Sequence, residues 1–366
     1  MLQTLLVVDA DVIDRMGGMI RHLCIGMIDE AVQVTVLNRS ADGEMETGLG
    51  LARVVHLPPT GWLWGRPTPE TILHAIGGQK PEVVHCLSAH LARWLIPCCD
   101  QWGSVLAVQL ADLHDADQFT RLRSRSPMMG IAMAGSIERA LVADAPELAD
   151  AVCVVPPGLP AQSEAIALSD PEQTPAAVVT APLTRKCGLY TIFKAMKMVI
   201  QAGHEVHLFV LSSGRAELAY RRAVDDLKLR PWVTFAGQLR DWATLRKAML
   251  TADFYIAPSA TARFEMSGLT ALAGGMVIFA AKGTTEDYLI DNRTAVLFDP
   301  ARPKQLAEKW SALLENRDLA RQLACGALEY ARTHHQAATM VTRIASLYRQ
   351  LCQRGEPVLQ TNADAS

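Results

Sequence analysis

The segment after the apolar run 252–257 carries the residues best suited to chemistry. Glu265 stands three positions before Gly268, and Thr270 follows at the start of a short helical pattern. A helix that begins after a strand offers free N–H groups and a positive dipole end, which suit a phosphate. The carboxylate could accept hydrogen bonds from sugar hydroxyls. The segment therefore predicts a nucleotide-sugar site.

The elements that must position this segment are short apolar runs alternating with helical patterns. Expected strands lie at 5–8, 32–37, 82–86, 105–108, 152–155, 177–179, 206–211, 232–235, 254–257, 277–280 and 295–298. Helical patterns follow around 304–315, 317–333 and 340–351. Such alternation predicts an α/β protein with parallel, doubly wound sheets, which bind ligands at the carboxyl ends of their strands.

Composition narrows the class of protein. A chain of 366 residues favours two domains, and a net charge of −3 with no clustered basic surface argues against nucleic acid as a partner. The eight cysteines form no C-x-x-C pair, so no zinc site or redox dithiol is indicated. No apolar run reaches about 18 residues, and the N-terminus lacks the pattern of a signal peptide. We expect a cytoplasmic protein, with weak peripheral contact at the inner face of the membrane left open.

The order of motifs resembles retaining glycosyltransferases of the GT-B fold, especially family 4 (glycosyl transferases group 1) and the related glycogen synthases. Their signature is Pro-Ser, a few residues, then Glu-x-x-Gly-Leu and a helix. Here Pro258 and Ser259 precede Glu265, Gly268 and Leu269 in that order. The resemblance runs through most of the chain. It implies two Rossmann-like domains that face each other across a cleft.

The resemblance also implies a domain plan. Residues 1–165 would form an acceptor-side domain and residues 166–335 a nucleotide-sugar-binding domain. A helix at 336–354 would cross back to the first domain, and 355–366 would be a disordered tail.

Family roles carry over onto several positions. Glu265 would orient the transferred sugar. A glycine turn at Gly17 and Gly18, after the first strand, would face the donor phosphate. Gly214 lies in a turn that approaches the nucleotide. The positions that would bind the donor through backbone N–H groups or close approach are Gly17, Gly18, Gly214, Ser267, Gly268, Leu269 and Thr270.

Two histidines are candidates for contact with substrate. His85 ends a strand that resembles the family's Asp-Val-Val-His, and His114 follows the next strand, although the position aligned with the family's sugar-binding histidine holds Gln109. The competing interpretation of His85 is a structural histidine at a strand end.

Three departures from the family concern the diphosphate and the ribose. The positions of the family's Arg and Lys hold Pro182 and Cys187. The second glutamate of the family motif is replaced by Ala273, or by Thr270 if the gap is placed before the helix. Arg185 and Lys186 lie next door and could neutralise the leaving group instead. The alternative is that both are solvated loop charges.

Two functions stay open. The first is a glycosyltransferase that moves a sugar from a UDP- or GDP-sugar to a glycan, lipid or small-molecule acceptor, in cell-surface polysaccharide or glycoconjugate synthesis. It would retain the configuration of the sugar and use no metal or further cofactor. The second is a catalytically degenerate GT-B protein that acts as a binding or partner subunit. The basic residues Arg121, Arg123 and Arg125 could touch an anionic acceptor or membrane, but a solvated face is the favoured interpretation.

Overall fold

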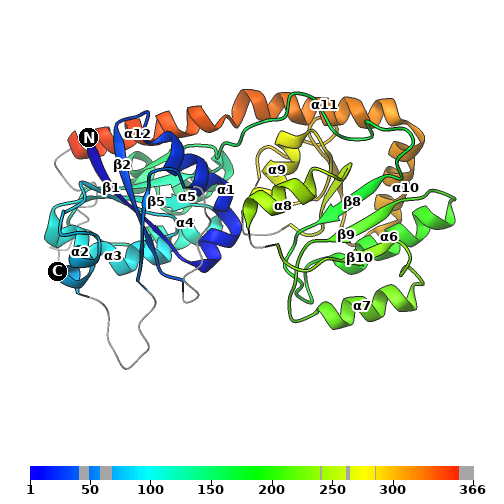
Figure 1. The fold of residues 1–366 in the computed structure, drawn as a ribbon, viewed down its shortest axis with the longest axis horizontal. Helices are drawn as coiled ribbons and strands as arrows, with labels where there is room; N and C mark the ends of the chain where they lie inside the picture. The colour runs from blue at the N-terminus through cyan, green and yellow to red at the C-terminus, as the bar shows by residue number, and fades with distance from the viewer. Residues whose placement is uncertain (41–48, 58–67, 240, 261–263, 285, 354–366) are drawn as a thin grey trace. The chain divides into compact units, whose positions relative to one another are not determined.

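The computed structural model describes residues 1–40, 49–57, 68–239, 241–260, 264–284 and 286–353. The expected tail at 355–366 lies outside these ranges. Contacts divide the chain into two compact units (Figure 1). Of the described residues, those up to Gly158, Phe264 and those from Ala337 onward form the first unit. The described residues of 159–260 and 265–336 form the second.

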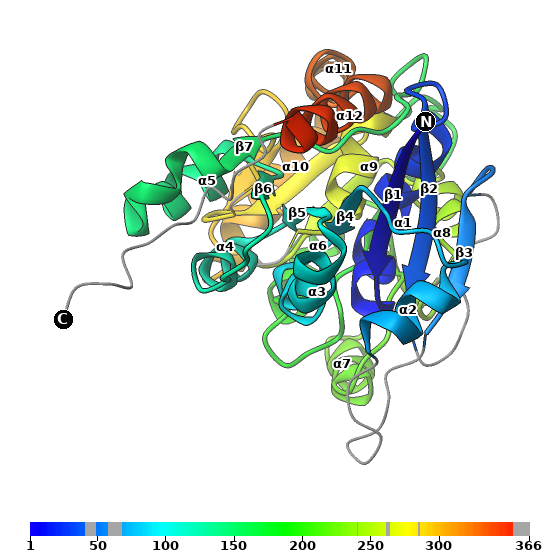
Figure 2. The ribbon, with the colours of Figure 1, turned by 90° about the vertical axis from the view of Figure 1, so that its left-hand side faces the viewer.

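The first unit contains a seven-stranded parallel sheet in the order β3-β2-β1-β4-β5-β6-β7 (Figure 2). Its strands are β1 (Leu2–Val8), β2 (Val32–Asn38), β3 (Arg53–His56), β4 (Val83–Cys86), β5 (Val105–Leu110), β6 (Met128–Ala132) and β7 (Val152–Val154). Its helices are α1 (Ala10–Gly26), α2 (Pro69–Ala75), α3 (Ala89–Trp102), α4 (Leu113–Thr120), α5 (Gly135–Asp144), the 3₁₀ helix η2 (Pro146–Ala151) and α12 (Ala337–Gln353). α1 packs against α12, and α3 packs against α2 and α4.

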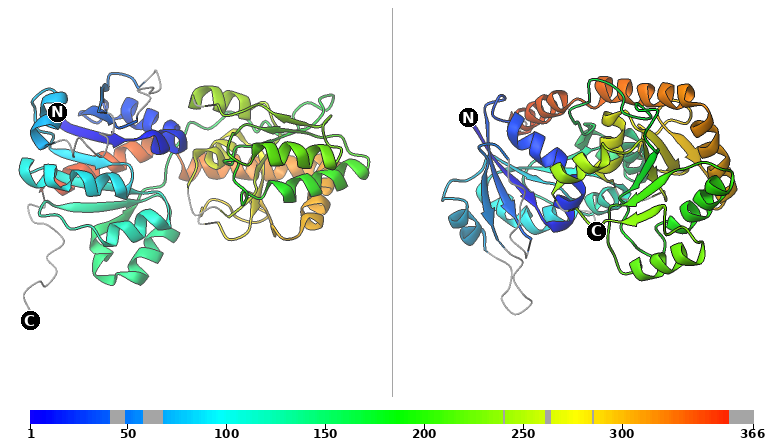
Figure 3. Two further views of the ribbon diagram at one scale, coloured as in Figure 1. Left: turned by 90° about the horizontal axis from the view of Figure 1, so that it is seen from below. Right: turned by 45° about the vertical axis from the view of Figure 1, so that its right-hand side comes forward.

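The second unit contains a six-stranded parallel sheet in the order β10-β9-β8-β11-β12-β13. Its strands are β8 (Ala176–Val179), β9 (His207–Val210), β10 (Val233–Phe235), β11 (Phe254–Ala257), β12 (Val277–Ala281) and β13 (Val296–Phe298). Its helices are α6 (Leu189–Gln201), α7 (Glu217–Asp226), α8 (Trp242–Met249), α9 (Met266–Gly274), α10 (Pro303–Glu315) and α11 (Arg317–His334). α10 packs against α6, and α11 packs against α9 (Figure 3).

Packing of the second unit explains why α9 holds its place. All nine residues of α9 are buried, including Ser267 and Thr270, because the helix is otherwise made of Met, Leu, Ala and Gly and has no charged face. In the core of this unit, the rings of Phe254 and Phe279 stack, and both pack at a tilt against Trp310, with centroids 5.8–6.1 Å apart. The helix that follows Glu265 is therefore fixed by the core rather than by solvent-exposed contacts.

The α/β class with two doubly wound parallel sheets is confirmed. The first unit ends at Gly158, before the expected boundary at 165, because the following residues are bound to the second unit. Gln162 N–H donates to the Ala273 carbonyl at 2.8 Å, and Arg332 donates to the carbonyl of Gln162 at 2.8 Å. Helix α12 groups with the first unit. No described helix is long and apolar enough to span a membrane.

Candidate functional site

Each sheet has one point where the chain order reverses. In the first unit this point lies between β1 and β4, and in the second it lies between β8 and β11. Ligands of doubly wound sheets bind outside the carboxyl ends of the strands at such a point. The loops that follow these four strands are therefore the expected ligand-binding positions.

A pocket lies at the reversal point of the second unit. Its walls come from the ends of β8, β11 and β12 and from the loops after them. The lining residues are Ala181, Tyr255, Ala257, Pro258, Ser259, Glu265, Ala280, Ala281, Thr284, Glu286 and Leu289. This set contains two carboxyl groups and no lysine, arginine or histidine. The pocket thus has the carboxylates that bind hydroxyl groups.

Glu265 lies in this pocket at the N-cap of α9, as a half-buried residue whose side chain makes no capping hydrogen bond. The helix begins at Met266, so its free N–H groups include those of Ser267 and Gly268. Thr270 lies beyond the first turn, where an N–H bonds to the carbonyl four residues before, and its hydroxyl donates to the Met266 carbonyl at 2.8 Å. The helix start therefore offers the backbone N–H groups of Ser267 and Gly268 to a ligand. The N–H and the hydroxyl of Thr270 are both used within the helix.

Two of the predicted donor-binding residues have a packing role. A Cβ on Gly268 would stand 2.4 Å from the Tyr288 hydroxyl. A Cβ on Gly214 would stand 2.6 Å from the Leu183 carbonyl oxygen, where two loops meet. Gly214 thus holds the turn after β9 against loop 181–188. Leu269 is buried within α9.

Glu286 is the pocket residue that sequence reasoning missed. It lies in the loop after β12, and burial raises the pKa of its carboxyl to about 7, with a further contribution from the charge of Glu265. Tyr255 and Tyr288 surround it, and burial raises the pKa of both phenols. The sequence signal was present: a carboxylate and Gly283 follow a buried strand, as Glu265 and Gly268 do.

Loop 181–188 leaves its two cations in solvent. Arg185 and Lys186 are exposed, neither lines the pocket, and neither has a charged partner among the described residues. Cys187, at the position of the family's lysine, is buried, and its Sγ donates to the Tyr220 hydroxyl at 3.2 Å. Gly188 closes the loop with a φ of +83°, and a Cβ there would stand 2.2 Å from the Pro258 carbonyl oxygen. The position of the family's lysine therefore points into the core.

The expected glycine turn at Gly17 and Gly18 is wrong. Helix α1 already begins at Ala10, because the Asp9 carboxylate caps it by accepting from Val12 N–H at 3.0 Å. Both glycines are buried inside the helix, directly after a kink at Met16, where φ is −124°. They therefore provide no loop at the end of β1.

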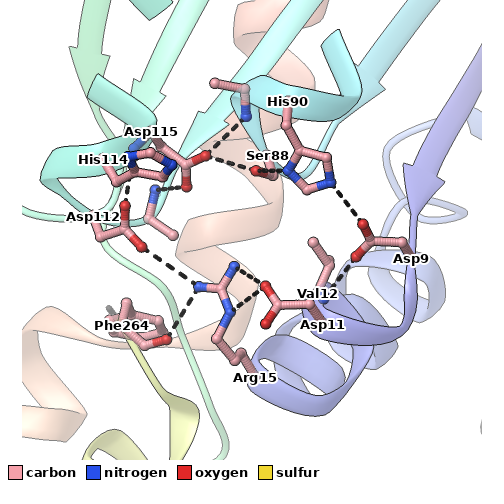
Figure 4. Close-up of polar contacts among 12 residues, drawn as sticks. Asp9, Asp11, Val12, Arg15, Ser88, His90, Asp112, His114, Asp115 and Phe264 are labelled. Atoms are coloured by element: carbon pink, nitrogen blue, oxygen red, sulfur yellow. Dashed lines mark hydrogen bonds and ion pairs between the residues drawn. The ribbon is translucent and has the colours of Figure 1, made fainter. Parts of the chain in front are cut away.

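A polar network occupies the reversal point of the first unit instead (Figure 4). Asp9 follows β1, and its Oδ2 lies 2.7 Å from His90 Nε2, at the start of α3. His90 Nδ1 lies 2.8 Å from Ser88 Oγ, which donates to Asp115 Oδ1 at 2.6 Å. This chain of hydrogen bonds joins the loops that follow β1, β4 and β5.

The network fixes the charge of His90. A serine hydroxyl has one proton, and Ser88 gives it to Asp115, so the Nδ1 of His90 must donate to Ser88. Nε2 must donate to Asp9, because a carboxylate accepts only. His90 is therefore an imidazolium. The hydrogen bond to Asp9 raises the pKa of His90. Burial acts to raise the pKa of Asp9, but the hydrogen bonds from His90 and Val12 outweigh it, so the pKa of Asp9 is lowered.

Arg15 contacts further residues at the same edge of the sheet through ion pairs and a hydrogen bond. Its Nη2 lies 3.0 Å from Asp11 Oδ2, and its Nη1 lies 3.8 Å from Asp112 Oδ2. Nη1 also donates to the Phe264 carbonyl at 3.4 Å. Asp112 caps α4 by accepting from Asp115 N–H at 2.9 Å. Sequence reasoning missed this network, although Asp9 and Asp112 each stand just after an apolar strand.

The two predicted substrate histidines lie apart from these features. His85 is 0% exposed, and its Nδ1 bonds the Tyr348 hydroxyl of α12 at 2.7 Å. Burial lowers the pKa of His85 to about 3, so it is neutral. We interpret it as the structural alternative, a strand-end histidine that joins β4 to α12. His114 is exposed on α4, with its Nε2 2.8 Å from Gln118 Nε2. Among the described residues, no group of three His, Cys, Asp or Glu side chains could hold a metal ion.

Comparison with known proteins agrees with this architecture. Residues 174–316 match the family model described as "Glycosyl transferases group 1". This match covers most of the second unit, including the pocket. No curated protein matches the chain by sequence.

Solved structures match almost the whole chain. Alr3699/HepE of Anabaena in complex with UDP has a TM-score of 0.73 at 15% identity, over 96% of this chain and 100% of that one. Sucrose-phosphate synthase of Thermosynechococcus elongatus has a TM-score of 0.74 at 16% identity, over 96% and 99%. A glycosyltransferase of Rickettsia africae ESF-5 has a TM-score of 0.72 at 12% identity, over 96% and 99%. The chain thus has the GT-B fold, and residues 174–316 are similar to the glycosyl transferases group 1 model.

Proposed function

We propose that this protein is a glycosyltransferase that binds a nucleotide-sugar in its second unit and transfers the sugar with retention of configuration. The observation that carries this proposal is the pocket at the reversal point of β8 and β11, where Glu265 occupies the N-cap position of α9. Its carboxylates suit sugar hydroxyls and its helix start suits a phosphate. Support also comes from a similar fold that has been solved with UDP and with UDP-glucose, that of Anabaena Alr3699/HepE.

In this proposal Glu265 orients the donor sugar. The N–H groups of Ser267 and Gly268 bind the phosphate of the donor that is attached to that sugar. Arg185 and Lys186 are the exposed cations nearest in sequence to the position of the family's lysine. They are the residues that we expect to move toward the diphosphate, since fixed positive charge stabilises a departing phosphate. UDP- and GDP-sugars are the proposed donors. No cofactor and no metal ion are included in the proposed mechanism. The acceptor would be a glycan, a lipid or a small molecule.

The second candidate is a GT-B protein that has lost transfer and serves as a binding or partner subunit. A specific observation favours it: the lysine position of the family is a buried Cys187 bonded to Tyr220, and neither Arg185 nor Lys186 lines the pocket. Loss of one charge at a leaving group costs several kcal/mol of transition-state stabilisation.

The test is the release of nucleoside diphosphate from a panel of UDP- and GDP-sugars, with and without simple saccharide acceptors. We expect turnover in the wild type, its loss in Glu265→Ala, and at least a tenfold decrease in the double variant Arg185→Ala and Lys186→Ala. Glu308→Ala, an exposed change on α10, is the matched control. NMR of the product anomer tests retention.

Binding of a nucleotide-sugar without any turnover would favour the partner-subunit alternative. Full turnover in Glu265→Ala would contradict the role of Glu265. Unchanged turnover in the double variant would contradict the proposed role of Arg185 and Lys186 at the diphosphate.

A further inference from the structure

The pocket holds a second carboxyl group in addition to Glu265. Glu286 comes from the loop after β12, yet it lines the same pocket as Glu265. Its Oε2 lies 3.7 Å from the point where a Cβ on Gly268 would stand, so the carboxyl lies beside the first turn of α9. The residue is only partly exposed, and burial is the main influence on its carboxyl.

The pocket around Glu286 is lined by no described cation, and only neutral hydrogen-bond donors offset the burial of its carboxyl. The groups facing it are the Glu265 carboxylate and backbone N–H, the Thr284 hydroxyl, and the phenols of Tyr255 and Tyr288. The Tyr288 hydroxyl is buried beside the carboxyl and acts to lower the pKa of Glu286, and its ring packs edge-on against His335 with centroids 5.5 Å apart. No lysine or arginine lines the described pocket.

Two carboxyl groups that line one pocket without a cation beside them disfavour each other's ionisation, so one of them keeps a proton more readily. Glu286 is the group that keeps it, because burial, together with the charge of Glu265, outweighs the hydrogen bonds from Tyr288, Thr284 and the Glu265 N–H that favour its ionised form. A carboxylic acid kept neutral in this way becomes a hydrogen-bond donor, whereas a carboxylate only accepts. The pocket would then present one donor and one acceptor side by side.

We propose that Glu286 works as a neutral acid that donates a hydrogen bond to a hydroxyl oxygen of the donor sugar, while the Glu265 carboxylate accepts one from a neighbouring hydroxyl. The pair would recognise two hydroxyl groups of a hexosyl donor, with Glu286 protonated and Glu265 ionised. Glu286 is thus a specificity-determining residue, and this role rests on the proposed function of the pocket.

The protonation state can be measured on the full chain without any ligand. We expect a ¹³C NMR titration of the glutamate carboxyls to show one signal with a midpoint near 7, absent in Glu286→Gln. Glu265→Gln should lower that midpoint, because it removes the neighbouring charge, and Glu308→Gln on the surface of α10 should not. Circular dichroism checks that each variant folds. Titration of every glutamate near the ordinary value of about 4.3 would overturn the proposal.

The sugar contact is tested by calorimetry with UDP, UDP-glucose, GDP and GDP-mannose between about pH 6 and about pH 8. For a midpoint near 7, the neutral fraction falls about tenfold over this interval. We expect the affinity for the nucleotide-sugar, relative to its nucleotide, to fall by a similar factor. Glu286→Gln, whose amide still donates, should keep the affinity and lose the pH dependence. An unchanged pH dependence in Glu286→Gln would overturn the proposal. Binding of no nucleotide-sugar at any pH would refute the proposed function, while the NMR titration would still decide whether Glu286 holds the proton.

Discussion

Replacement of Gly188 by alanine tests the geometry that brings loop 181–188 against the pocket. Gly188 caps α6 with a φ of +83°, which costs an L-residue about 1–2 kcal/mol. An added Cβ would also stand 2.2 Å from the Pro258 carbonyl oxygen, and Pro258 lines the pocket. Overpacking of this kind costs about 1–3 kcal/mol, so we expect Gly188→Ala to lower the free energy of unfolding by roughly 2–5 kcal/mol.

Gly203, just past the other end of α6, provides a matched control. Its φ is +91°, and a Cβ there would meet nothing within 4 Å. Gly203→Ala should therefore cost only the backbone term of about 1–2 kcal/mol. The difference between the two variants isolates the contact with Pro258.

Urea unfolding of both variants gives the two costs, and calorimetry gives their affinity for a nucleotide-sugar. We expect Gly188→Ala to be the less stable variant and to bind more weakly, because a displaced Pro258 deforms the pocket wall. Equal stability and equal affinity in the two variants would refute the close approach of this loop to the end of β11.

Three further predictions concern buried and charged groups. Because the folded-state pKa of His90 is raised, its pairing with Asp9 stabilises fully below the ordinary histidine range and is lost as pH rises through the folded value. His90→Asn should thus destabilise more at about pH 5.5 than at about pH 9 in urea unfolding, and equal costs would contradict the imidazolium. Tyr348→Phe leaves the buried Nδ1 of His85 unpaired and should cost about 1–3 kcal/mol in the same assay. A cost near zero would argue against that hydrogen bond. Cys187→Lys should lower the melting temperature, because it buries an unpaired charge against Tyr220; a stable variant with tighter donor binding would mean that this side chain can reach the diphosphate.

Much of the fold could be predicted because local pattern and tertiary structure agree. The apolar runs at β8, β11 and β12 are buried on both faces, so they appear as continuous hydrophobic stretches. Two strands escaped prediction for physical reasons. β3 is a short edge strand with no fully buried residue, and β6 contains two methionines and a glycine in place of β-branched residues.

The site was less predictable, because tertiary contacts decide it. The pair of glycines at 17 and 18 is typical of a turn, but the Asp9 cap and the Asp11–Arg15 ion pair start the helix earlier. Glu286 stands 21 positions after Glu265, and only the pairing of β11 with β12 brings both to one pocket. His85 has the right residue type at a strand end, and its burial under Tyr348 follows only from the packing of α12.

The most direct test of the account is a calorimetric titration of the full chain with UDP-sugars and GDP-sugars, in the wild type, Glu265→Ala and the surface control Glu308→Ala. The account predicts saturable binding of at least one nucleotide-sugar, loss of the sugar's contribution in Glu265→Ala, and no change in Glu308→Ala. Absence of binding in the wild type, or equal affinities in all three proteins, would contradict the assignment of a donor site to this pocket.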